Sequence, residues 1–272
     1  MATVEDHRLA RELATGAGDL LIRLRDRLVA SGADVDTIRT CGDLAAHHYL
    51  VDRLRAERPD DAVLSEEHAA EEHSDRSRLT ASRVWIVDPL DGTREYGEGR
   101  DDFAVHVALV ENHRPTAGAV ALPAEGIVFD TLDPPRLPER TDRAADAPLR
   151  IAVSRSRPPA LADTLVADLG AGTVPMGSAG VKVVAVVRGL ADAYVHAGGQ
   201  FQWDNCAPAA VALAAGVTCT RLDGSELSYN GPDLSVPDLL VCRPELLDLL
   251  RSELDEIEAR EPGAVRPPAE RG

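Results

Sequence analysis

The fold is decided by the stretch Trp85-Ile86-Val87-Asp88-Pro89-Leu90-Asp91-Gly92-Thr93. Its three apolar residues predict a buried strand that carries Asp88 at its end. Pro89 has no N–H and a fixed φ, so it turns the chain out of the strand. Asp91 follows three residues after Asp88, which lets both carboxylates face one side of the turn. Gly92 allows backbone to approach a ligand closely, and Thr93 opens a helix whose amides suit phosphate.

The turn therefore predicts a metal and phosphate site. The Asp88 and Asp91 carboxylates and the Leu90 carbonyl are hard oxygen ligands of the kind that Mg²⁺ prefers. A bare DxxDGT is equally compatible with a turn in which Asp91 or Thr93 only caps a helix. The DxDGT motif, in which the first aspartate is attacked by its substrate, is excluded. In this chain two residues separate the aspartates, and the motif starts at residue 88 rather than on the first strand.

Two more acidic positions extend the site. Glu66 lies in Ser65-Glu66-Glu67, directly after a short apolar run, and Asp204 follows Trp203 at the expected start of a helix. Taken singly, Glu66 also fits a solvated acidic loop, and Asp204 also fits a helix cap. Together with Asp88 and Asp91 they supply the carboxylates of a two-metal site, which can activate a water and stabilise a leaving oxygen.

The remaining sequence predicts an α/β protein in two halves, residues 1–145 and 146–272, separated by a segment rich in Pro, Arg and Asp at 133–148. Apolar periodicity predicts helices at 5–31, 43–57, 159–169, 179–189, 203–215 and 245–259. Strands are predicted at 62–64, 84–87, 103–111, 115–122, 127–129, 151–153, 193–195 and 239–241, with a hairpin turn at Asn112-His113. Residues 68–82 and the last dozen residues are predicted to be loops.

Composition limits the partners. The formal net charge of −17 disfavours nucleic acid and anionic membrane surfaces. No apolar run reaches the roughly 20 residues that span a bilayer, and the N-terminus lacks the apolar region of a signal peptide. The four cysteines form no CxxC pair, which is typical of free thiols in a reducing cytoplasm. A phosphate substrate would also be repelled by this chain, unless bound metal neutralises the site.

WIVDPLDGT, the preceding Ser-Glu-Glu and the later Trp-Asp-x-x-Ala together resemble the inositol monophosphatase superfamily of Mg²⁺-dependent, Li⁺-sensitive phosphatases. The resemblance covers nearly the whole chain and implies a layered αβαβα sandwich with two or three Mg²⁺ ions per site. It implies one metal bound by Glu66, Asp88 and the Leu90 carbonyl, and a second bound by Asp88, Asp91 and Asp204. It further implies that Thr93, with Glu66 or Asp43, orients the attacking water, and that the Gly92 and Thr93 amides hold the phosphate.

Within the superfamily the chain is most similar to the CysQ-like branch, which removes the 3′-phosphate of 3′-phosphoadenosine 5′-phosphate, a small nucleotide. Val-Ser-Arg-Ser at 153–156, Gly-Ser-x-x-x-Lys at 177–182 and Arg-Glu-Tyr at 94–96 carry this similarity. It implies substrate contacts from Ser154, Arg155, Ser178 and Lys182. Lys182 is the single lysine in a chain that otherwise uses arginine, and it lies at the start of an expected helix that Ser178 caps. A compact ammonium there would suit a second phosphate. The alternative for Lys182 is a solvent-exposed helix lysine. The alternative for Ser154 and Arg155 is a polar strand end.

Some features depart from the family pattern. Its T-x-A-D element reads Thr40-Cys41-Gly42-Asp43 in this chain, and the lysine often found nearby is absent. Asp34 and Asp36 are interpreted as solvated residues rather than ligands of a third metal. None of the histidines has metal-ligand spacing, and His106, between two valines, is interpreted as a strand residue that faces a polar side.

Two other functions stay open from the sequence. An inositol-1-phosphate or fructose-1,6-bisphosphate phosphatase would use the same metal site, but residues 196–202 lack the Glu that marks dedicated inositol enzymes. A regulator that binds metal or nucleotide without catalysis is the second alternative. Both a monomer and a homodimer are compatible with the sequence.

Overall fold

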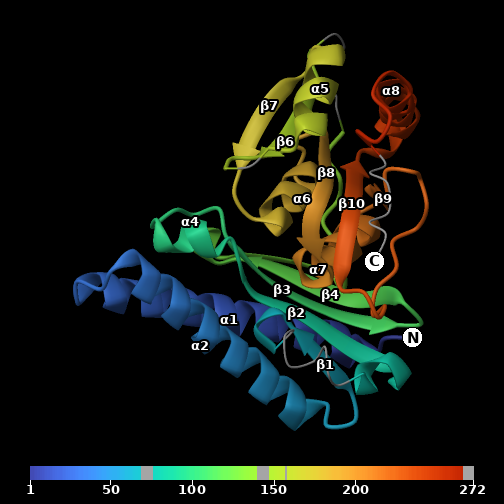
Figure 1. Cartoon of the computed structure of the whole chain (residues 1–272). Helices are drawn as coiled ribbons and strands as arrows, with labels where there is room; N and C mark the ends of the chain where they lie inside the picture. Colours follow the sequence, from blue (N-terminus) through green and yellow to red (C-terminus); the bar gives the residue numbers. More distant parts are fainter. Residues whose placement is uncertain (69–75, 140–146, 157, 266–272) are drawn as a thin grey trace.

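Five layers of secondary structure build the protein (Figure 1). The computed structural model describes residues 1–68, 76–139, 147–156 and 158–265. Its helices are α1 Val4–Ala30, α2 Val35–Glu57, α4 Thr93–Gly97, α5 Ala160–Asp168, α6 Ala179–Val187, α7 Gln202–Ala214 and α8 Leu247–Arg260. Its strands are β1 Ala62–Ser65, β2 Arg83–Asp91, β3 Ala104–Glu111, β4 Arg114–Leu122, β5 Ile127–Asp130, β6 Arg150–Ser154, β7 Gly172–Met176, β8 Ala193–Phe201, β9 Thr218–Thr220 and β10 Ser235–Cys242. Short 3₁₀ turns lie at Glu66–His68, Ser77–Thr80, Pro123–Glu125 and Pro244–Leu246.

The strands form two five-stranded sheets. The first has the order β1-β2-β3-β4-β5, with β1 parallel to β2 and every other pair antiparallel. The second has the order β7-β6-β8-β10-β9, in which β6 runs parallel to both of its neighbours. The predicted hairpin at Asn112-His113 is confirmed, because Glu111 pairs with Arg114 and both turn residues have positive φ, 50° and 63°. This is the geometry of a two-residue hairpin turn whose twist matches that of its strands.

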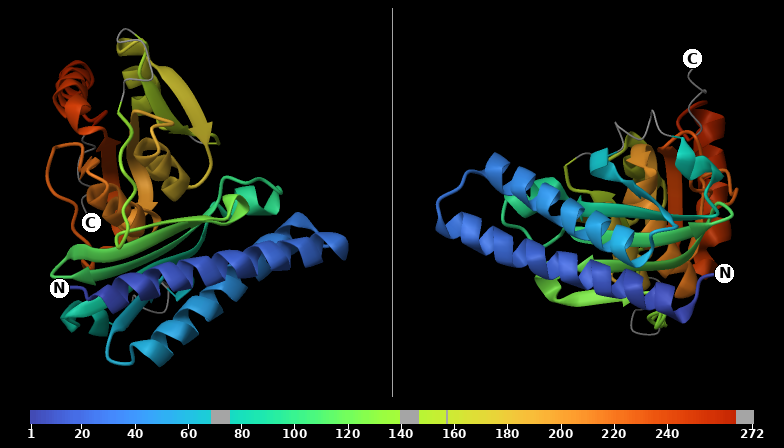
Figure 2. Two further views of the ribbon diagram at one scale, coloured as in Figure 1. Left: turned by 180° about the vertical axis from the view of Figure 1, so that it is seen from behind. Right: turned by 90° about the horizontal axis from the view of Figure 1, so that it is seen from below.

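Three hydrophobic cores explain why there are five layers. Helices α1 and α2 lie side by side across one face of the first sheet (Figure 2), and their apolar stripes bury Trp85 and Tyr96 with the sheet. Helices α6 and α7 fill the space between the two sheets. Helices α5 and α8 cover the outer face of the second sheet. Each helix pair therefore has an apolar surface to bury, and the predicted αβαβα sandwich is confirmed.

The structure corrects several predicted boundaries. Helix α2 begins at Val35 instead of residue 43, because Asp34 caps it by accepting a hydrogen bond from the Thr37 amide. Gly42 is tolerated inside this helix since it gives room to the Tyr96 ring, which would lie 2.5 Å from an added Cβ. Strands β7 and β9 were not predicted, and β8 and β10 are longer than predicted. Ser77–Thr80 forms a 3₁₀ turn within a segment predicted to be a loop.

The predicted halves, 1–145 and 146–272, each contribute one sheet, and they share the core that α6 and α7 fill. Their division into separate folding units stays a prediction. Parts of the linker (140–146) and of the tail (266–272), together with His73, lie outside the described residues. Within the described part of the chain, no helix combines the length and the apolar character needed to cross a membrane.

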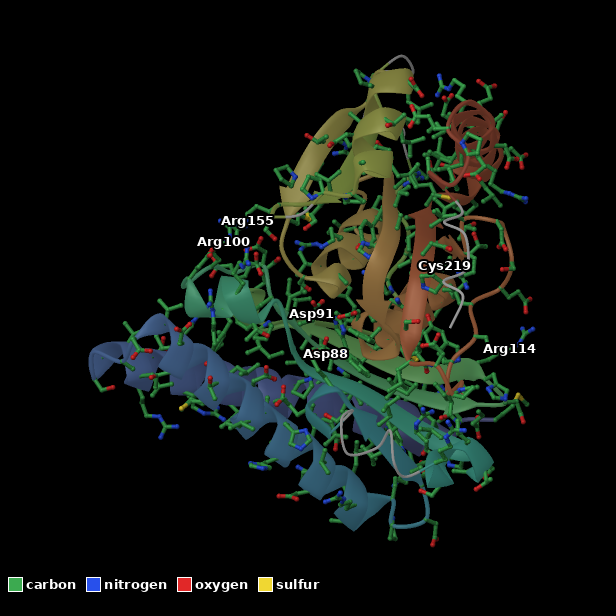
Figure 3. All side chains as sticks on the ribbon, viewed as in Figure 1. Asp88, Asp91, Arg100, Arg114, Arg155 and Cys219 are labelled. Atoms are coloured by element: carbon green, nitrogen blue, oxygen red, sulfur yellow. The ribbon has the colours of Figure 1, made fainter. Side chains whose placement is uncertain are left out.

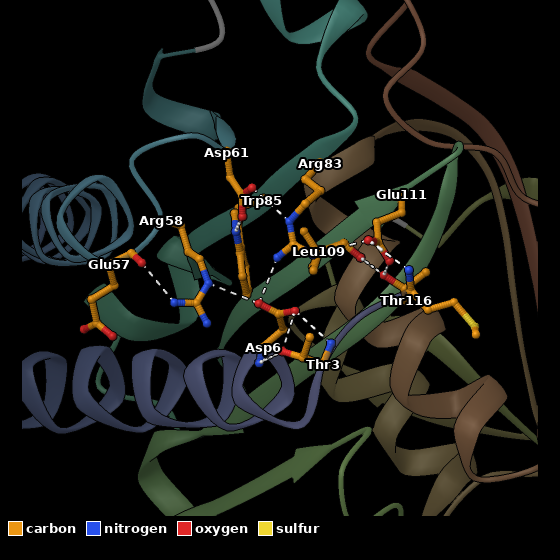
Figure 4. A network of polar contacts seen from close by, with 11 residues as sticks. Thr3, Asp6, Glu57, Arg58, Asp61, Arg83, Trp85, Leu109, Glu111 and Thr116 are labelled. Atoms are coloured by element: carbon orange, nitrogen blue, oxygen red, sulfur yellow. Dashed lines mark hydrogen bonds and ion pairs between the residues drawn. The ribbon is translucent and has the colours of Figure 1, made fainter.

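A polar network joins the start of α1 to the start of β2 and to the end of α2 (Figure 4). The Asp6 carboxylate is 2% exposed and accepts hydrogen bonds from Arg83 at 2.8 Å and from Arg58 at 3.1 Å. It also accepts a hydrogen bond from the Thr3 amide at 2.8 Å, which caps the helix. Burial alone would raise the pKa of Asp6, but the hydrogen bonds from Thr3, Arg83 and Arg58 hold it well below its usual range. The network therefore stabilises the fold at neutral pH, and this contribution is lost as pH falls from the ordinary aspartate pKa of 3.8 through the lower folded-state value.

We expect Asp6→Ala to lower the free energy of unfolding by about 2 kcal/mol, because it removes the acceptor of Thr3 and Arg58 and one of the three carboxylate partners of Arg83, which keeps Asp61 and Glu111. Urea unfolding followed by circular dichroism measures this loss. Asp36→Asn is the matched control, since its carboxylate is 91% exposed and forms a surface ion pair with Arg39. We expect the control to leave the midpoint unchanged. Equal midpoints for both variants would contradict this role for Asp6.

Candidate active site

Strand β2 delivers two carboxylates to one place. Asp88 is 1% exposed and Asp91 is 9% exposed, and both lie between the first sheet and helices α6 and α7 (Figure 3). The pairing of β2 with β3 jumps from Asp88–His106 to Asp91–Ala104, so the chain bulges over Pro89 and Leu90. The Leu90 amide donates to Asp88 Oδ1 at 3.0 Å and fixes that side chain. The bulge turns both carboxylates toward the same side, as the sequence predicted.

Asp204 completes an acidic cluster with Asp88 and Asp91. One carboxylate oxygen from each residue lies within 4.8 Å of the others. Asp204 is in the first turn of α7, where its Oδ2 accepts a hydrogen bond from the Phe201 amide at 2.6 Å. The helix start therefore fixes the side chain of Asp204, and its Oδ1 stays available to a ligand. Oxygens at this spacing are within reach of one hard divalent cation, so the cluster could bind a metal.

Like charges crowd around this cluster. Burial, followed by the charges of Asp43, Asp204 and Asp91, raises the pKa of Glu66 to about 8. Burial and the neighbouring Asp91 raise the pKa of Asp204 to about 7. Burial and Glu66 place the pKa of Asp88 well above its usual value. Carboxylates held this close must take up either protons or a cation at neutral pH. The donor set therefore fits a hard divalent metal ion.

Thr93 and Asp43 lie beside the cluster. The Thr93 hydroxyl donates to the Leu90 carbonyl at 2.9 Å, and its proximity partly opposes the rise in the pKa of Asp43. Burial and the neighbouring Glu67 raise the pKa of Asp43 to about 7. Its buried Oδ1 has no hydrogen-bond partner among the described residues. Gly92 precedes α4 with a φ of 91°, and an added Cβ would lie 3.2 Å from the backbone of Phe103. Only glycine suits this conformation and this close approach.

A cavity of about 570 Å³ opens over the cluster. Its lining contains these predicted site residues: Asp91, Gly92, Thr93, Ser154, Ser178, Lys182 and Asp204. Arg155 does not line it, because its guanidinium donates to Glu95 at 2.7 Å and to Glu98 at 2.8 Å. The structure thus brings together metal and substrate candidates from both halves of the chain, whereas Arg155 lies beside the cavity in an ion pair.

Lys182 is not an exposed helix lysine. It is 5% exposed, and its Nζ donates to the carbonyls of Gly177 at 2.7 Å and Ser178 at 2.6 Å. The ammonium also lies 5.3 Å from the centre of the Tyr194 ring. Burial lowers its pKa, and the charges of Asp91 and Glu95 oppose this effect. Ser178 caps α6 through the Val181 amide, as predicted, and its hydroxyl donates to Asp91.

Sequence reasoning missed several residues of the site. Glu95, Tyr194, His196 and Gln200 line the cavity, although none belongs to a motif that names it as a ligand. His106 lies on β3 as predicted, but the polar side that it faces is the buried acidic cluster, because its Nε2 is 3.3 Å from Asp91 Oδ2. Asp34 and Asp36 lie at the start of α2, where Asp34 is a helix cap.

The comparisons agree with this geometry. A sequence model of the inositol monophosphatase family matches residues 4–259. The chain belongs to the inositol monophosphatase family. Among members of this family, a 3′-phosphoadenosine 5′-phosphate phosphatase of Mycobacterium leprae is 45% identical over 269 residues, which cover 94% of this chain and 96% of that protein. The 3′(2′),5′-bisphosphate nucleotidase CysQ of Escherichia coli K12 is 32% identical over 80% of this chain and 92% of its own length.

A solved structure shows the same inositol monophosphatase fold. CysQ from Bacteroides thetaiotaomicron superposes with a TM-score of 0.73, at 27% identity, over 88% of this chain and 97% of that one. The resemblance to the family and to its CysQ-like branch, predicted from the DPLDGT turn and its companion motifs, is confirmed.

Proposed function

We propose that this chain is a Mg²⁺-dependent phosphatase that removes the 3′-phosphate of 3′-phosphoadenosine 5′-phosphate (PAP) to give AMP. One observation carries the proposal: the Asp88, Asp91 and Asp204 oxygens converge within 4.8 Å at a cavity of about 570 Å³. Support for the substrate comes from the M. leprae relative, which is named for this activity and matches 94% of the chain. 3′-Phosphoadenosine 5′-phosphosulfate (PAPS), in which a sulfate is attached to the 5′-phosphate of PAP, is a second candidate substrate of the same site.

The metal ligands of the proposal follow the family pattern. Glu66, Asp88 and the Leu90 carbonyl would hold one ion, and Asp88, Asp91 and Asp204 would hold a second. When bound, such ions lower the pKa of a water and stabilise charge on the leaving oxygen. The burial of these carboxylates supports this assignment, because a site that excludes water strengthens their attraction for a cation.

The attacking water is proposed to be held by Thr93 with Asp43 or Glu66. The Thr93 hydroxyl lies 2.9 Å from the Leu90 carbonyl, and the unpartnered Asp43 Oδ1 can accept a hydrogen bond from a water beside it. A water fixed by two acceptors has its lone pair directed away from them, toward the phosphorus. The Gly92 and Thr93 amides are the proposed contacts for the phosphate that leaves. No phospho-enzyme is formed in this scheme.

The second phosphate of the substrate needs a cation in a chain of net charge −17. Lys182 is the proposed partner, because the residue lines the cavity and its ammonium uses two of its three protons on backbone carbonyls. Ser154 and Ser178 add hydroxyl groups to the same wall. Arg155 would contribute by exchanging one of its carboxylate partners for phosphate, since Glu98 lies near the surface.

Further properties belong to the same proposal. Li⁺ should inhibit at concentrations at which Na⁺ does not. The protein would act in a reducing cytoplasm as a monomer or homodimer on a small nucleotide, without binding nucleic acid or membrane. All four cysteines are free, which agrees with such an environment.

Phosphate release measured on PAP, inositol 1-phosphate and fructose 1,6-bisphosphate, with Mg²⁺ and with added Li⁺, tests the proposal. We expect kcat/KM for PAP to exceed the other two by at least about 100-fold, which is ~2.7 kcal/mol of transition-state binding. The reason is that PAP carries a second phosphate for Lys182 to neutralise, which inositol 1-phosphate lacks, and a nucleoside, which fructose 1,6-bisphosphate lacks. A preference for inositol phosphate would contradict the nucleotidase assignment, and no release from any substrate would favour a non-catalytic regulator.

A further inference from the structure

A fully buried histidine lies behind the acidic cluster. His106 is 0% exposed and faces Asp88 across the β2–β3 ladder. Its Nδ1 is 3.1 Å from the Trp203 carbonyl, and its Nε2 is 3.3 Å from Asp91 Oδ2. A carbonyl oxygen can only accept, so Nδ1 carries the proton of the first contact. Nε2 makes no hydrogen bond within the described residues, so it meets Asp91 Oδ2 as a packing contact. The ring therefore touches β2 on one side and the start of α7 on the other.

A third element packs against the same ring. A Cβ added to Gly180, in the first turn of α6, would lie only 2.0 Å from His106 Nε2. The Gly180 amide in turn donates to Asp91 Oδ2 at 2.8 Å. Because the backbone of α6 contacts both the ring and the carboxylate, His106 and Asp91 cannot shift independently of this helix.

These contacts connect the carboxylates of the proposed metal site. Asp91 touches the ring directly, and Asp204 follows Trp203, whose carbonyl accepts from the ring. The residues come from two sheet strands and two helices that are far apart in sequence, and they meet at a single imidazole. Partners behind metal ligands orient those ligands and tune the affinity for the ion.

We propose that His106 is a positioning residue that sets the separation of the Asp91 and Asp204 carboxylates, and thereby the affinity of the cluster for divalent cations. This inference rests on the proposed function, because it assumes that the cluster binds metal. A histidine that only filled the core would stabilise the fold and leave metal affinity unchanged.

The test measures Mn²⁺ binding in the absence of substrate, with the electron paramagnetic resonance signal of free Mn²⁺ as the readout. His106→Leu fills the space of the ring and makes no hydrogen bond. We expect its Kd for Mn²⁺ to rise about 10- to 100-fold, the usual loss when a partner behind a metal ligand is removed. His106→Asn places an amide near Nδ1 and His106→Gln places one near Nε2. We expect both variants to bind Mn²⁺ more tightly than His106→Leu. The difference between their affinities shows how much the contact at each ring nitrogen contributes.

His113→Asn is the matched control. His113 Nδ1 contacts the Tyr229 carbonyl at 2.9 Å, a comparable long-range contact to backbone, but the residue lies in the β3–β4 turn. We expect its Mn²⁺ affinity to equal that of the wild type. Melting temperatures in EDTA show which variants are folded. If His106→Leu does not fold, the Mn²⁺ affinities of His106→Asn and His106→Gln are compared with that of the wild type instead.

Three outcomes separate the claims. Folded His106 variants that bind Mn²⁺ within twofold of the wild type would overturn the inference and leave the proposed function intact. A lower melting temperature in EDTA with unchanged affinity would show a packing role alone and would also overturn it. A wild-type protein that binds no Mn²⁺ would overturn the proposed metal site and this inference with it.

Discussion

Asp88→Asn is expected to lower kcat/KM for PAP by at least about 1000-fold, or ~4 kcal/mol of transition-state stabilisation. Asp88 is the one carboxylate that the proposal assigns to both metal ions, and an amide of the same shape supplies no charge. The fold should persist, because the Asn oxygen can still accept the Leu90 amide that Asp88 Oδ1 accepts at 3.0 Å. Removing one of several crowded charges should even raise the melting temperature in EDTA. Phosphate release and thermal unfolding measure the two effects.

Asp238→Asn is the matched control for this prediction. Asp238 is also a buried carboxylate, 8% exposed, but it pairs with Arg221 at 2.8 and 2.7 Å in the second sheet. We expect this control to lose stability and to keep kcat/KM for PAP. Near-wild-type phosphate release by Asp88→Asn would remove the basis for the metal site.

The metal-free protein is expected to lose stability as pH rises from about 5 to 9. The pKa values of Glu66, Asp43 and Asp204 in the folded state are about 8, 7 and 7, mainly because burial opposes their charge. Unfolding restores ordinary values near 4, so the folded state binds more protons between these limits. Stability contributed by these protonated groups is present at low pH and is lost as pH rises through the folded-state values. The loss should be on the order of a few kcal/mol.

Urea unfolding in EDTA across this pH range measures the loss, and a parallel series in Mg²⁺ provides the comparison. A bound cation replaces the protons, so we expect the Mg²⁺ series to be nearly flat and more stable at pH 8. Asp88→Asn in EDTA should show a shallower pH dependence than the wild type. A metal-free stability that is constant or rises between pH 5 and 9 would contradict the crowding of charge at this site.

Local sequence signals predicted the centre of the fold well. The buried strand and the helix start between Trp85 and Thr93 depend on an apolar run and a glycine that act within a few residues. The prediction that Pro89 ends the strand was wrong, because Pro89 lies in a bulge and β2 continues to Asp91. The hairpin at Asn112-His113 and the cap at Ser178 are equally local. Each was predicted because short-range backbone chemistry determines it.

Boundaries set by long-range packing were missed. The second helix was predicted to start at residue 43, whereas α2 starts at Val35 and includes Gly42, against which the Tyr96 ring packs. Strand β7 contains Pro175 and is an edge strand, where proline is tolerated. The capping signal of Asp34 was available in the sequence, and it was interpreted as a solvated acid.

The acidic residues of the site were predicted from motifs, but their surroundings were not. Lys182 was selected by composition, and its hydrogen bonds to the carbonyls of its own helix start were not foreseen. His106 contacts a carbonyl 97 residues away in sequence. No periodicity or spacing reports such a contact, because it depends on how α7 packs against the first sheet.

The central claim is that the Asp88, Asp91 and Asp204 carboxylates form the metal site of a phosphatase. Anomalous diffraction from crystals soaked in Mn²⁺, with phosphate release assayed on the same protein, tests it most directly. The account predicts a manganese peak within about 2.5 Å of oxygens from these three residues. Metal-dependent phosphate release together with a peak elsewhere, and none at this cluster, would contradict it.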